Sequence, residues 1–486
     1  MNSKNLLSET IERRGIERVI TENRFDKNSW NNFPIWIVFS AESYGLPSGR
    51  RGVITNLTRE FSIKALILFV FLISTAESSF SAPLVSKDLL LFYQDLHQNP
   101  ELSLKEEQTG AALAKGLEKE GVKVTYPFAG TGVVGVFKNG SGKTVLLRTD
   151  LDALPIIEET SLPYASKKKA INKSGREVGV MHACGHDIHV TNLLGTVRNL
   201  IKNKNRWQGT LVVIGQPAEE IGQGADQMIA GGLFKKFPKP DYALAFHVDA
   251  GLATGKVSYV SGPVMAAADS VEVTFLGKGG HGALPHDDID PIVIASRFVL
   301  DLQTLISRER DPRAPSVISV GSFQCGTKPN ITPDKCLLEL TVRSFTKDER
   351  TRLLEGIKRK AEASSLSSNA PKPLVELTKE AIPATFNDPG LTARLVAILQ
   401  TSLGKDKVIQ GSPVTVSEDF SRYSEGGISS VMLFLGSVNE KRLGALRKKG
   451  SLPSLHSSRY YPDAEETLST GIQAMTSLVE GLLPPG

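Results

Sequence analysis

The sequence predicts an α/β fold in which a helix-covered mixed sheet is interrupted by a smaller domain. Helix and strand patterns alternate from about residue 85, which is typical of a sheet covered by helices. Residues 266–375 follow the order β-α-β-β-α-β of the ferredoxin-like split motif, and the first alternation then resumes. We therefore expect a larger domain made of residues 85–265 and 376–486, the smaller domain between these parts, and an N-terminal extension over 1–84.

The larger domain begins with two helical patterns, "KDLLLFYQDLHQNPELS" and "EEQTGAALAKGLEKEG", whose apolar residues recur on one face. Strands are predicted at "GVVGVF", "TVLLRTDLDAL" and "GTLVVIGQPAEE", and a further helix at "HVTNLLGTVRNLI". Polar residues follow three strands, in "RTDLD", "PAEE" and "FHVD". Ligands of such sheets gather at the carboxyl ends of the strands, so these residues are grouped as candidates for one site.

The smaller domain is predicted from strands at "DSVEVTFLG", "SVISVGSF", "LLELTVRS" and "PLVEL", with helices at "DPIVIASRFVLDLQTLIS" and "KDERTRLLEGIKRKAEAS". Cys325 and Cys336 flank the turn-rich "GTKPNITPDK" between the two middle strands. A hairpin would bring the two thiols within bridging distance. Two unbridged cysteines are an equally open alternative.

The N-terminal extension contains "ALILFVFLI" at residues 65–73, after Arg59 and Lys64 and before "STAESSFSA". A basic flank, a short apolar core and small residues form the layout of a secretory signal. The run is shorter than the roughly 20 residues of a membrane-spanning helix, so no stable membrane span is expected. If 65–82 is a signal segment, we expect export to the periplasm or the medium, and otherwise a cytoplasmic protein. The alternative for residues 65–73 is a buried strand or helix of the fold. The net charge of +5 on 486 residues gives no reason to expect nucleic acid as a partner.

The segment "MHACGHDIHV", residues 181–190, holds three of the eight histidines and one of the three cysteines. Cys184 and His186 are separated only by Gly185, so a thiolate and an imidazole lie close enough to begin a metal site. Neighbouring His and Asp side chains could orient these ligands. The alternative is an ordinary helix start with Asp187 as its cap.

Four further residues after apolar strands or in a polar turn could complete the site: Glu219, Glu220, His247 and His456. Adjacent glutamates can take different roles, one as ligand and one as base. Cys184, His186, Glu220, His247 and His456 make five ligands, and if one of them bridges two ions, each ion has three protein ligands and an open position. The pattern therefore predicts two divalent ions, with zinc, manganese, cobalt and nickel all acceptable to this donor set.

Eight ordered segments resemble signature blocks of the M20 metallopeptidase family, most closely its aminoacylase-like branch of hippurate hydrolases and plant auxin-conjugate hydrolases. They are "RTDLDALPI", "MHACGHDIHV", "GQPAEE", "FHVDAG", "GKGGHGALPHDDIDP", "NITPD", "SEDFS" and "LHSSRYYPDAEE", and the resemblance spans about residues 88–480. It implies a catalytic α/β domain interrupted by a lid that commonly serves dimerisation. A homodimer or homo-oligomer through the lid is therefore expected.

The resemblance also implies roles for individual residues. Cys184, His186, Glu220, His247 and His456 match the family's metal ligands. Glu219 matches the general base, and Asp150 matches an aspartate that orients a ligand. In the lid, His281 matches a histidine that steadies the oxyanion, often from the partner subunit, while Asn330 and Arg343 match residues that hold the substrate carboxylate. Gly282 replaces a common alanine, a small departure.

The function implied is metal-dependent hydrolysis of the amide bond of N-acyl amino acids, with a hippurate-like substrate. A dipeptidase or carboxypeptidase on the same metal centre is the nearest alternative. A binding protein without turnover would be expected to lack the base or a ligand, and all are present. A cysteine hydrolase with Cys184 as nucleophile would leave Glu219, Glu220 and the later histidines without a role.

Overall fold

The structure is a computed structural model that describes residues 85–377, 381–451 and 454–486. The predicted N-terminal extension over 1–84 and its signal-like run over 65–73 lie outside the described residues, so export stays a prediction. Among the described residues, no helix combines the length and the apolar character that crossing a membrane requires.

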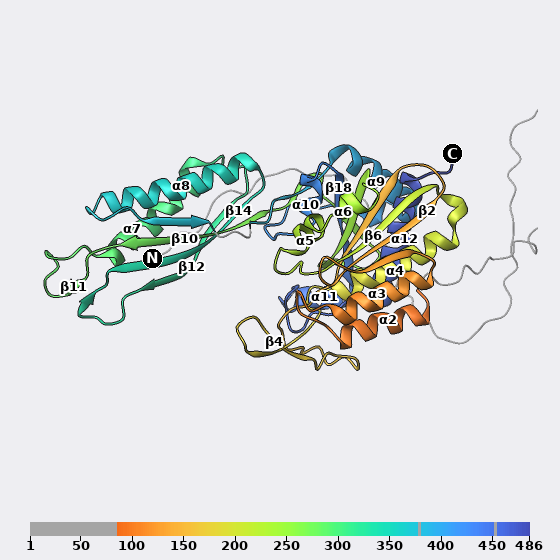
Figure 1. Ribbon diagram of the computed structural model, residues 1–486, viewed down its shortest axis with the longest axis horizontal. Coiled ribbons are helices and arrows are strands. Elements are labelled where there is room, and N and C mark those ends of the chain that lie inside the picture. Colours follow the sequence, from red (N-terminus) through yellow and green to blue (C-terminus); the bar gives the residue numbers. More distant parts are fainter. Residues whose placement is uncertain (1–84, 378–380, 452–453) are drawn as a thin grey trace, which may run out of the picture. The chain divides into compact units, whose positions relative to one another are not determined.

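An eight-stranded mixed sheet forms the centre of the larger α/β part (Figure 1). Four of its central strands, β6, β3, β7 and β18, run parallel to one another, so their carboxyl ends lie at the same edge. These strands are buried on both faces and therefore read as nearly continuous apolar runs. In order across the sheet the strands are β1 (Lys123–Phe128), β2 (Gly132–Asn139), β6 (Gly209–Gln216), β3 (Thr144–Asp150), β7 (Tyr242–Ala253), β18 (Ser429–Val438), β8 (Val257–Tyr259) and β17 (Val408–Gln410).

Helices cover both faces of this sheet, each over its own apolar cluster. One face carries α2 (Lys87–Gln98), α3 (Glu107–Lys119), α4 (His186–Lys202), α9 (Pro389–Leu403) and α12 (Ala464–Leu482). The other face carries the short α5 (Gly224–Ala230), α6 (Leu233–Lys236) and α10 (Ser421–Glu425). Helix α2 is shorter than its apolar pattern predicts because Pro100 disfavours helical geometry in the residue before it.

The smaller part is a four-stranded antiparallel sheet in the order β12-β14-β10-β15. Its elements are β10 (Ala267–Leu276), α7 (Pro291–Thr304), β12 (Val317–Cys325), β14 (Lys335–Ser344), α8 (Lys347–Leu366) and β15 (Leu374–Leu377). Residues alternate between buried and accessible along β10, and the buried ones pack against both helices (Figure 1). This is the predicted ferredoxin-like order, and we call this part the lid. The division of the chain into domains at the predicted boundaries stays a prediction.

The chain passes between the larger part and the lid twice. These two connecting segments, which we call the chain crossings, pair with each other. β9 (Gly262–Met265) pairs with β16 (Thr385–Asn387), and Ala268 pairs with Ile382 one step further along. Shorter elements of the described chain include the hairpin of β4 (Lys169–Ile171) and β5 (Glu177–Gly179), the pair β11 (Gly280–His281) and β13 (Ile331–Thr332), and helix α11 (Glu440–Lys448).

The two lid cysteines form a disulfide. Cys325 ends β12 and lies opposite Cys336 on β14, with 4.5 Å between their Cα atoms. Of the two alternatives that the sequence left open, the structure has the bridged one. The disulfide closes the loop that carries Asn330 and β13.

Candidate metal centre

The five predicted ligands come from separate segments and meet at the carboxyl-end edge of the central strands. Cys184 lies in the turn before α4, His186 is the first residue of α4, Glu220 follows β6, His247 lies within β7, and His456 precedes α12. With Glu219, all of them except His186 line one cavity of about 530 Å³, which we call the metal cavity. His186 is fully buried directly behind its wall.

The donor atoms are separated as ligands of shared ions would be. The Cys184 Sγ atom lies 3.5 Å from His247 Nε2 and 3.3 Å from His456 Nε2. His456 Nε2 is 3.5 Å from one Glu220 oxygen, and His186 Nε2 is 3.8 Å from the other. Ligands at 2.0–2.3 Å around a tetrahedral ion are roughly 3.3–3.8 Å apart. Two groups able to hold an ion, Cys184–His186–His247 and Cys184–Glu220–His456, share the cysteine.

Two of these donors have no hydrogen-bond partner among the described residues. His186 Nε2 and Glu220 Oε1 are both buried and unpartnered. A buried polar atom without a partner costs on the order of 1–3 kcal/mol, more when it is charged. Burial, together with the nearby glutamates, also raises the pKa of the Cys184 thiol well above its usual value. A divalent cation bound among these atoms would relieve all three costs, so the residues present fit a metal.

Backbone carbonyls fix which ring nitrogen each histidine presents to the cavity. His186 Nδ1 lies 2.8 Å from the main-chain oxygen of Asp152, and His247 Nδ1 lies 2.8 Å from that of Val248. Each ring donates Nδ1–H to a carbonyl and leaves Nε2 free for an ion. The Asp152 carboxylate accepts a hydrogen bond from the Glu220 main-chain nitrogen at 2.9 Å. Asp152 therefore connects two of the candidate ligands.

The predicted orienting residue, Asp150, contacts a different histidine. Its Oδ1 accepts from His189 Nδ1 at 2.7 Å, and its Oδ2 is paired with Arg148 at 2.7 Å. Burial lowers the pKa of His189 to about 4, so the ring is neutral and its Nε2 accepts the Val248 N–H at 2.9 Å. Asp150 Oδ2 comes no closer than 3.7 Å to the ring of His186. Sequence reasoning missed Asp152, which lies two residues beyond the end of β3.

A tight turn aims both glutamates into the metal cavity. Ala218 has a positive φ of 54°, Gly222 one of 66°, and the Gly222 N–H donates to the carbonyl of Glu219 at 2.7 Å. One oxygen of Glu219 and one of Glu220 each lie 3.8 Å from His186 Nε2. The turn therefore keeps two adjacent side chains near one ring.

Behind Glu219 lies a buried network that sequence reasoning did not include. The Arg148 guanidinium donates to Glu418 at 2.7 Å, to Asp419 at 3.1 Å and to Gln216 at 3.1 Å. Burial, and then the charge of Glu418, raise the pKa of Glu219 well above its usual range. The segment "SEDFS" supplies both acids, Glu418 and Asp419. Their positions are explained by the buried Arg148, which the sequence analysis did not include.

The three lid residues predicted from the sequence differ in whether they reach the metal cavity. Arg343 on β14 donates to Ser417 Oγ at 2.5 Å, and Ser417 lines the metal cavity. His281 on β11 is exposed, and its Nδ1 accepts the N–H of Ala283 at 3.1 Å. Asn330 is also exposed, and its carbonyl accepts the N–H of Gly282 at 3.0 Å. Within the described part of this chain, only Arg343 of the three reaches the rim of the cavity.

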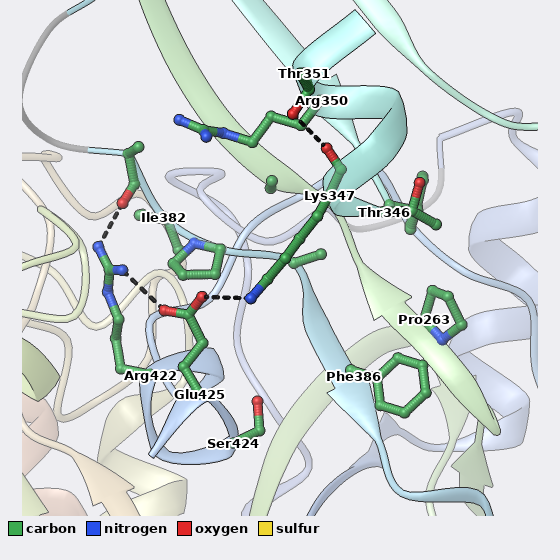
Figure 2. Close-up of a pocket in the computed structure, with 15 residues that line it drawn as sticks. Pro263, Thr346, Lys347, Arg350, Thr351, Ile382, Phe386, Arg422, Ser424 and Glu425 are labelled. Atoms are coloured by element: carbon green, nitrogen blue, oxygen red, sulfur yellow. Dashed lines mark hydrogen bonds and ion pairs between the residues drawn. The ribbon is translucent and has the colours of Figure 1, made fainter. Parts of the chain in front are cut away.

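A second cavity, of about 650 Å³, lies where the two chain crossings meet α8, and we call it the hinge cavity (Figure 2). Lys347 extends toward Glu425 at 3.8 Å, and Glu425 pairs with Arg422 at 3.2 Å. Arg350 is bound by Asp269 at 2.6 Å. No group of the described residues that could hold a metal includes a residue of this wall.

Comparison with known proteins identifies the family. Residues 146–481 match the model of "Peptidase family M20/M25/M40", which is more than half of the chain. The chain belongs to this family. It is therefore a metal-dependent hydrolase of the M20 amidohydrolase and peptidase group, as the sequence segments indicate.

Curated M20 relatives carry several activities. The chain is 36% identical to thermostable carboxypeptidase 2 of Saccharolobus solfataricus, over 78% of this chain and 91% of that protein. It is 35% identical to IAA-amino acid hydrolase ILR1-like 4 of Arabidopsis thaliana, over 79% and 83%. It is 36% identical to N-acetyl-L-cysteine deacetylase of Bacillus subtilis, over 70% and 78%.

Solved M20-type structures share the fold. A candidate aminohydrolase from methicillin-resistant Staphylococcus aureus aligns with a TM-score of 0.73 at 31% identity, covering 81% of this chain and 96% of that one. The YXEP protein of Bacillus subtilis, described as a dinuclear metal-binding peptidase, aligns with a TM-score of 0.67 at 28% identity, covering 82% and 98%.

Proposed function

We propose that this M20 protein is a two-metal amidohydrolase that cleaves N-acyl amino acids, with a hippurate-like substrate. Water and the amide would give a carboxylic acid and a free amino acid. The observation that carries the proposal is the convergence of Cys184, His186, Glu220, His247 and His456, with Glu219 beside them, in one cavity. The names of the relatives, an amino acid hydrolase and a deacetylase among them, support this class of bond.

Each proposed role follows from position. The five clustered donors would hold two divalent ions, which acidify water and polarise a carbonyl when bound. Glu219 takes the proton from the attacking water and delivers it to the amide nitrogen as the C–N bond breaks. Arg343, at the rim beside Ser417, is placed to pair with the substrate carboxylate.

His281 and Asn330 are placed differently by this proposal. Both are exposed on the lid and away from the metal cavity of their own chain. We propose that they act on a neighbouring subunit of a homodimer, where His281 would donate to the developing oxyanion. The lid remains the proposed dimerisation surface.

A dipeptidase is the second candidate, because one carboxylate outside the metal cluster lines the cavity. Asp249 follows His247 by two positions on β7 and so shares its face of the strand. Its Oδ1 accepts the N–H of Gly251 at 2.7 Å, which leaves the other oxygen able to receive a substrate α-ammonium.

The test is hydrolysis by protein stripped with a chelator and reloaded with zinc, manganese, cobalt or nickel. Substrates are benzoyl-, acetyl- and indole-acetyl-amino acids beside unmodified dipeptides. Glu219→Gln should abolish turnover while metal content, measured by inductively coupled plasma mass spectrometry, stays unchanged. Glu466→Gln, on the surface helix α12, is the matched control. Preference for dipeptides that Asp249→Asn removes would establish the second candidate, and turnover that survives in Glu219→Gln would overturn both.

A further inference from the structure

The disulfide of the lid lies at the end of a strand ladder, next to the loop that carries Asn330. Cys325 and Cys336 are the last paired residues of β12 and β14 on that side, and residues 326–335 form the loop between them. The Cys336 side chain is fully buried in the apolar core of the lid, whereas residues 326–331 are all exposed. Hydrolysis as proposed uses neither cysteine, so the crosslink needs a separate explanation.

Hydrogen bonds from this loop hold the segment that carries His281. Strand β11, which ends at His281, pairs with β13 inside the loop. After His281, the N–H of Gly282 donates to the carbonyl of Asn330 at 3.0 Å. Before it, the N–H of Gly279 donates to the carboxylate of Asp334 at 2.9 Å. The loop therefore positions the main chain on both sides of His281.

Glycines allow the two segments to approach this closely. A Cβ atom at Gly279 would lie 2.8 Å from the carbonyl oxygen of Thr332, which is closer than real Cβ atoms come to other heavy atoms. A Cβ atom at Gly282 would lie 3.2 Å from the main chain of Asn330. Because the two backbones are in direct contact, a displacement of the loop would displace the His281 segment as well.

The ring of His281 is in turn oriented by this main chain. Its Nδ1 accepts the N–H of Ala283 at 3.1 Å. In a neutral imidazole one nitrogen accepts and the other donates, so Nε2 carries the hydrogen. The proposed contact with the oxyanion needs this Nε2–H, and such a donor acts only when it is held in the correct direction. The direction of Nε2–H therefore depends on the loop between the two cysteines.

We propose that the Cys325–Cys336 disulfide positions His281 for catalysis and that its reduction lowers turnover. The inference rests on the proposed function and concerns the regulation of that site. The last pair of a strand ladder is where local opening is easiest, and the S–S bond closes this pair covalently. The two cysteines are thus positioning residues that act through the loop.

Reduction by a dithiol would release the loop. One thiolate of the dithiol bonds to the sulfur of Cys325, which is half-buried, and the buried Cys336 leaves and takes a proton. The second thiol of the dithiol then displaces Cys325 as a thiol and closes a cyclic disulfide. The candidate metal ligands all lie in the larger part of the chain, so metal binding should not change.

The experiment measures kcat of the metal-loaded protein with a benzoyl-amino acid. Cys325→Ser removes the S–S bond and leaves Cys336 in the core. We expect kcat to fall about fivefold or more, because a misplacement of about 1 Å can cost up to about 100-fold. Metal content, measured by inductively coupled plasma mass spectrometry, should stay unchanged. The matched control is Ser319→Ala with Thr341→Ala, an opposed pair of the same strands away from the loop, which should retain kcat.

His281→Ala distinguishes positioning from a general loss of lid stability. If the disulfide acts through His281, adding Cys325→Ser to His281→Ala should lower kcat by less than about twofold further, since the two changes remove one interaction. An equal loss in both backgrounds, or full activity of Cys325→Ser, would overturn the inference.

Dithiothreitol supplies a second measurement. Wild type treated with it, desalted and reloaded with metal in the absence of oxygen should match Cys325→Ser, and Cys325→Ser should not respond to the same treatment. An equal response of both proteins would assign the effect to the metal centre and overturn the inference. If the wild type cleaves dipeptides but no acylated amino acid, the proposed function itself fails, and the same comparisons made with a dipeptide still test the disulfide.

Discussion

The metal cavity and the hinge cavity are similar in size but opposite in their electrostatics. In the hinge cavity, Lys347 and Arg422 reach Glu425, and Arg350 reaches Asp269, so each charge has a counter-charge. At the metal cavity, His186 Nε2 and Glu220 Oε1 are buried without a hydrogen-bond partner among the described residues. The charged side chains of the hinge cavity therefore balance one another, whereas the donors of the metal cavity would need bound cations as partners. Buried donors without hydrogen-bond partners, rather than volume, distinguish the proposed site.

The largest expected effect comes from removing one donor of the metal cavity. His186→Ala should lower kcat/KM by more than about 100-fold, since even residues that only orient metal ligands contribute 10- to 100-fold. Metal content should fall in parallel, read by inductively coupled plasma mass spectrometry. Glu425→Gln in the hinge cavity should retain both activity and metal. Comparable losses in the two variants would remove the distinction between the cavities.

Next in size is the effect of the arginine behind Glu219. Arg148→Met leaves Asp150, Glu418 and Asp419 buried without their counter-ion, which should cost about 3–5 kcal/mol of stability. Thermal unfolding followed by circular dichroism gives the comparison. Arg313→Met, whose partner Asp311 lies at the surface, should change the melting temperature very little. An unchanged midpoint in Arg148→Met would show that the network does not support the site.

A smaller, pH-dependent effect is expected at His97, behind α4. Burial alone would lower the pKa of His97, but its hydrogen bonds to Asp187 and Glu158 raise it from 6.5 to about 9. A raised folded-state pKa stabilises below pH 6.5, and that stabilisation, up to about 3 kcal/mol, is lost as pH rises through 9.

The Tm difference between wild type and His97→Gln should therefore be large at pH 6 and shrink by pH 10. His286→Gln is the control, because His286 is exposed on the lid. A difference that grows with pH would have the wrong sign for this interpretation.

The smallest effect belongs to the hinge cavity. Lys347 is 90% exposed, so its ion pair with Glu425 should contribute less than about 1 kcal/mol. Chemical denaturation of Lys347→Met should show this small loss in low salt and none in 1 M sodium chloride, where screening is strong. A loss of several kcal/mol that salt does not alter would mean that the hinge cavity is held by more than balanced surface charge.

The fold could be predicted because periodicity is local. Alternating patterns reveal each helix and strand, and the β-α-β-β-α-β order then restricts the lid to few arrangements. The grouping of "RTDLD", "PAEE" and "FHVD" followed from strand ends alone. The structure brings their acidic and histidine side chains to one cavity or directly behind its wall.

The remaining contacts of the site depend on distances in space, which cannot be derived from the spacing of residues along the sequence. Asp150 ends β3 and Asp152 lies two residues beyond it. Only the structure shows that the Asp150 carboxylate accepts from His189 and the Asp152 main-chain oxygen from His186. The turn at Ala218, which keeps two adjacent glutamates together, depends on a positive φ that alanine rarely adopts. Whether the lid cysteines pair depended likewise on the register of two strands.

The cysteine inventory has a practical consequence. Of the three cysteines in this sequence, two are joined in the lid, so Cys184 is its one free thiol. That thiol sits among the donors of the metal cavity, where a bound cation would shield it from reagents. A thiol-reactive dye would thus label one atom in proportion to empty sites. The extent of Cys184 labelling would therefore measure metal occupancy without an assay of turnover.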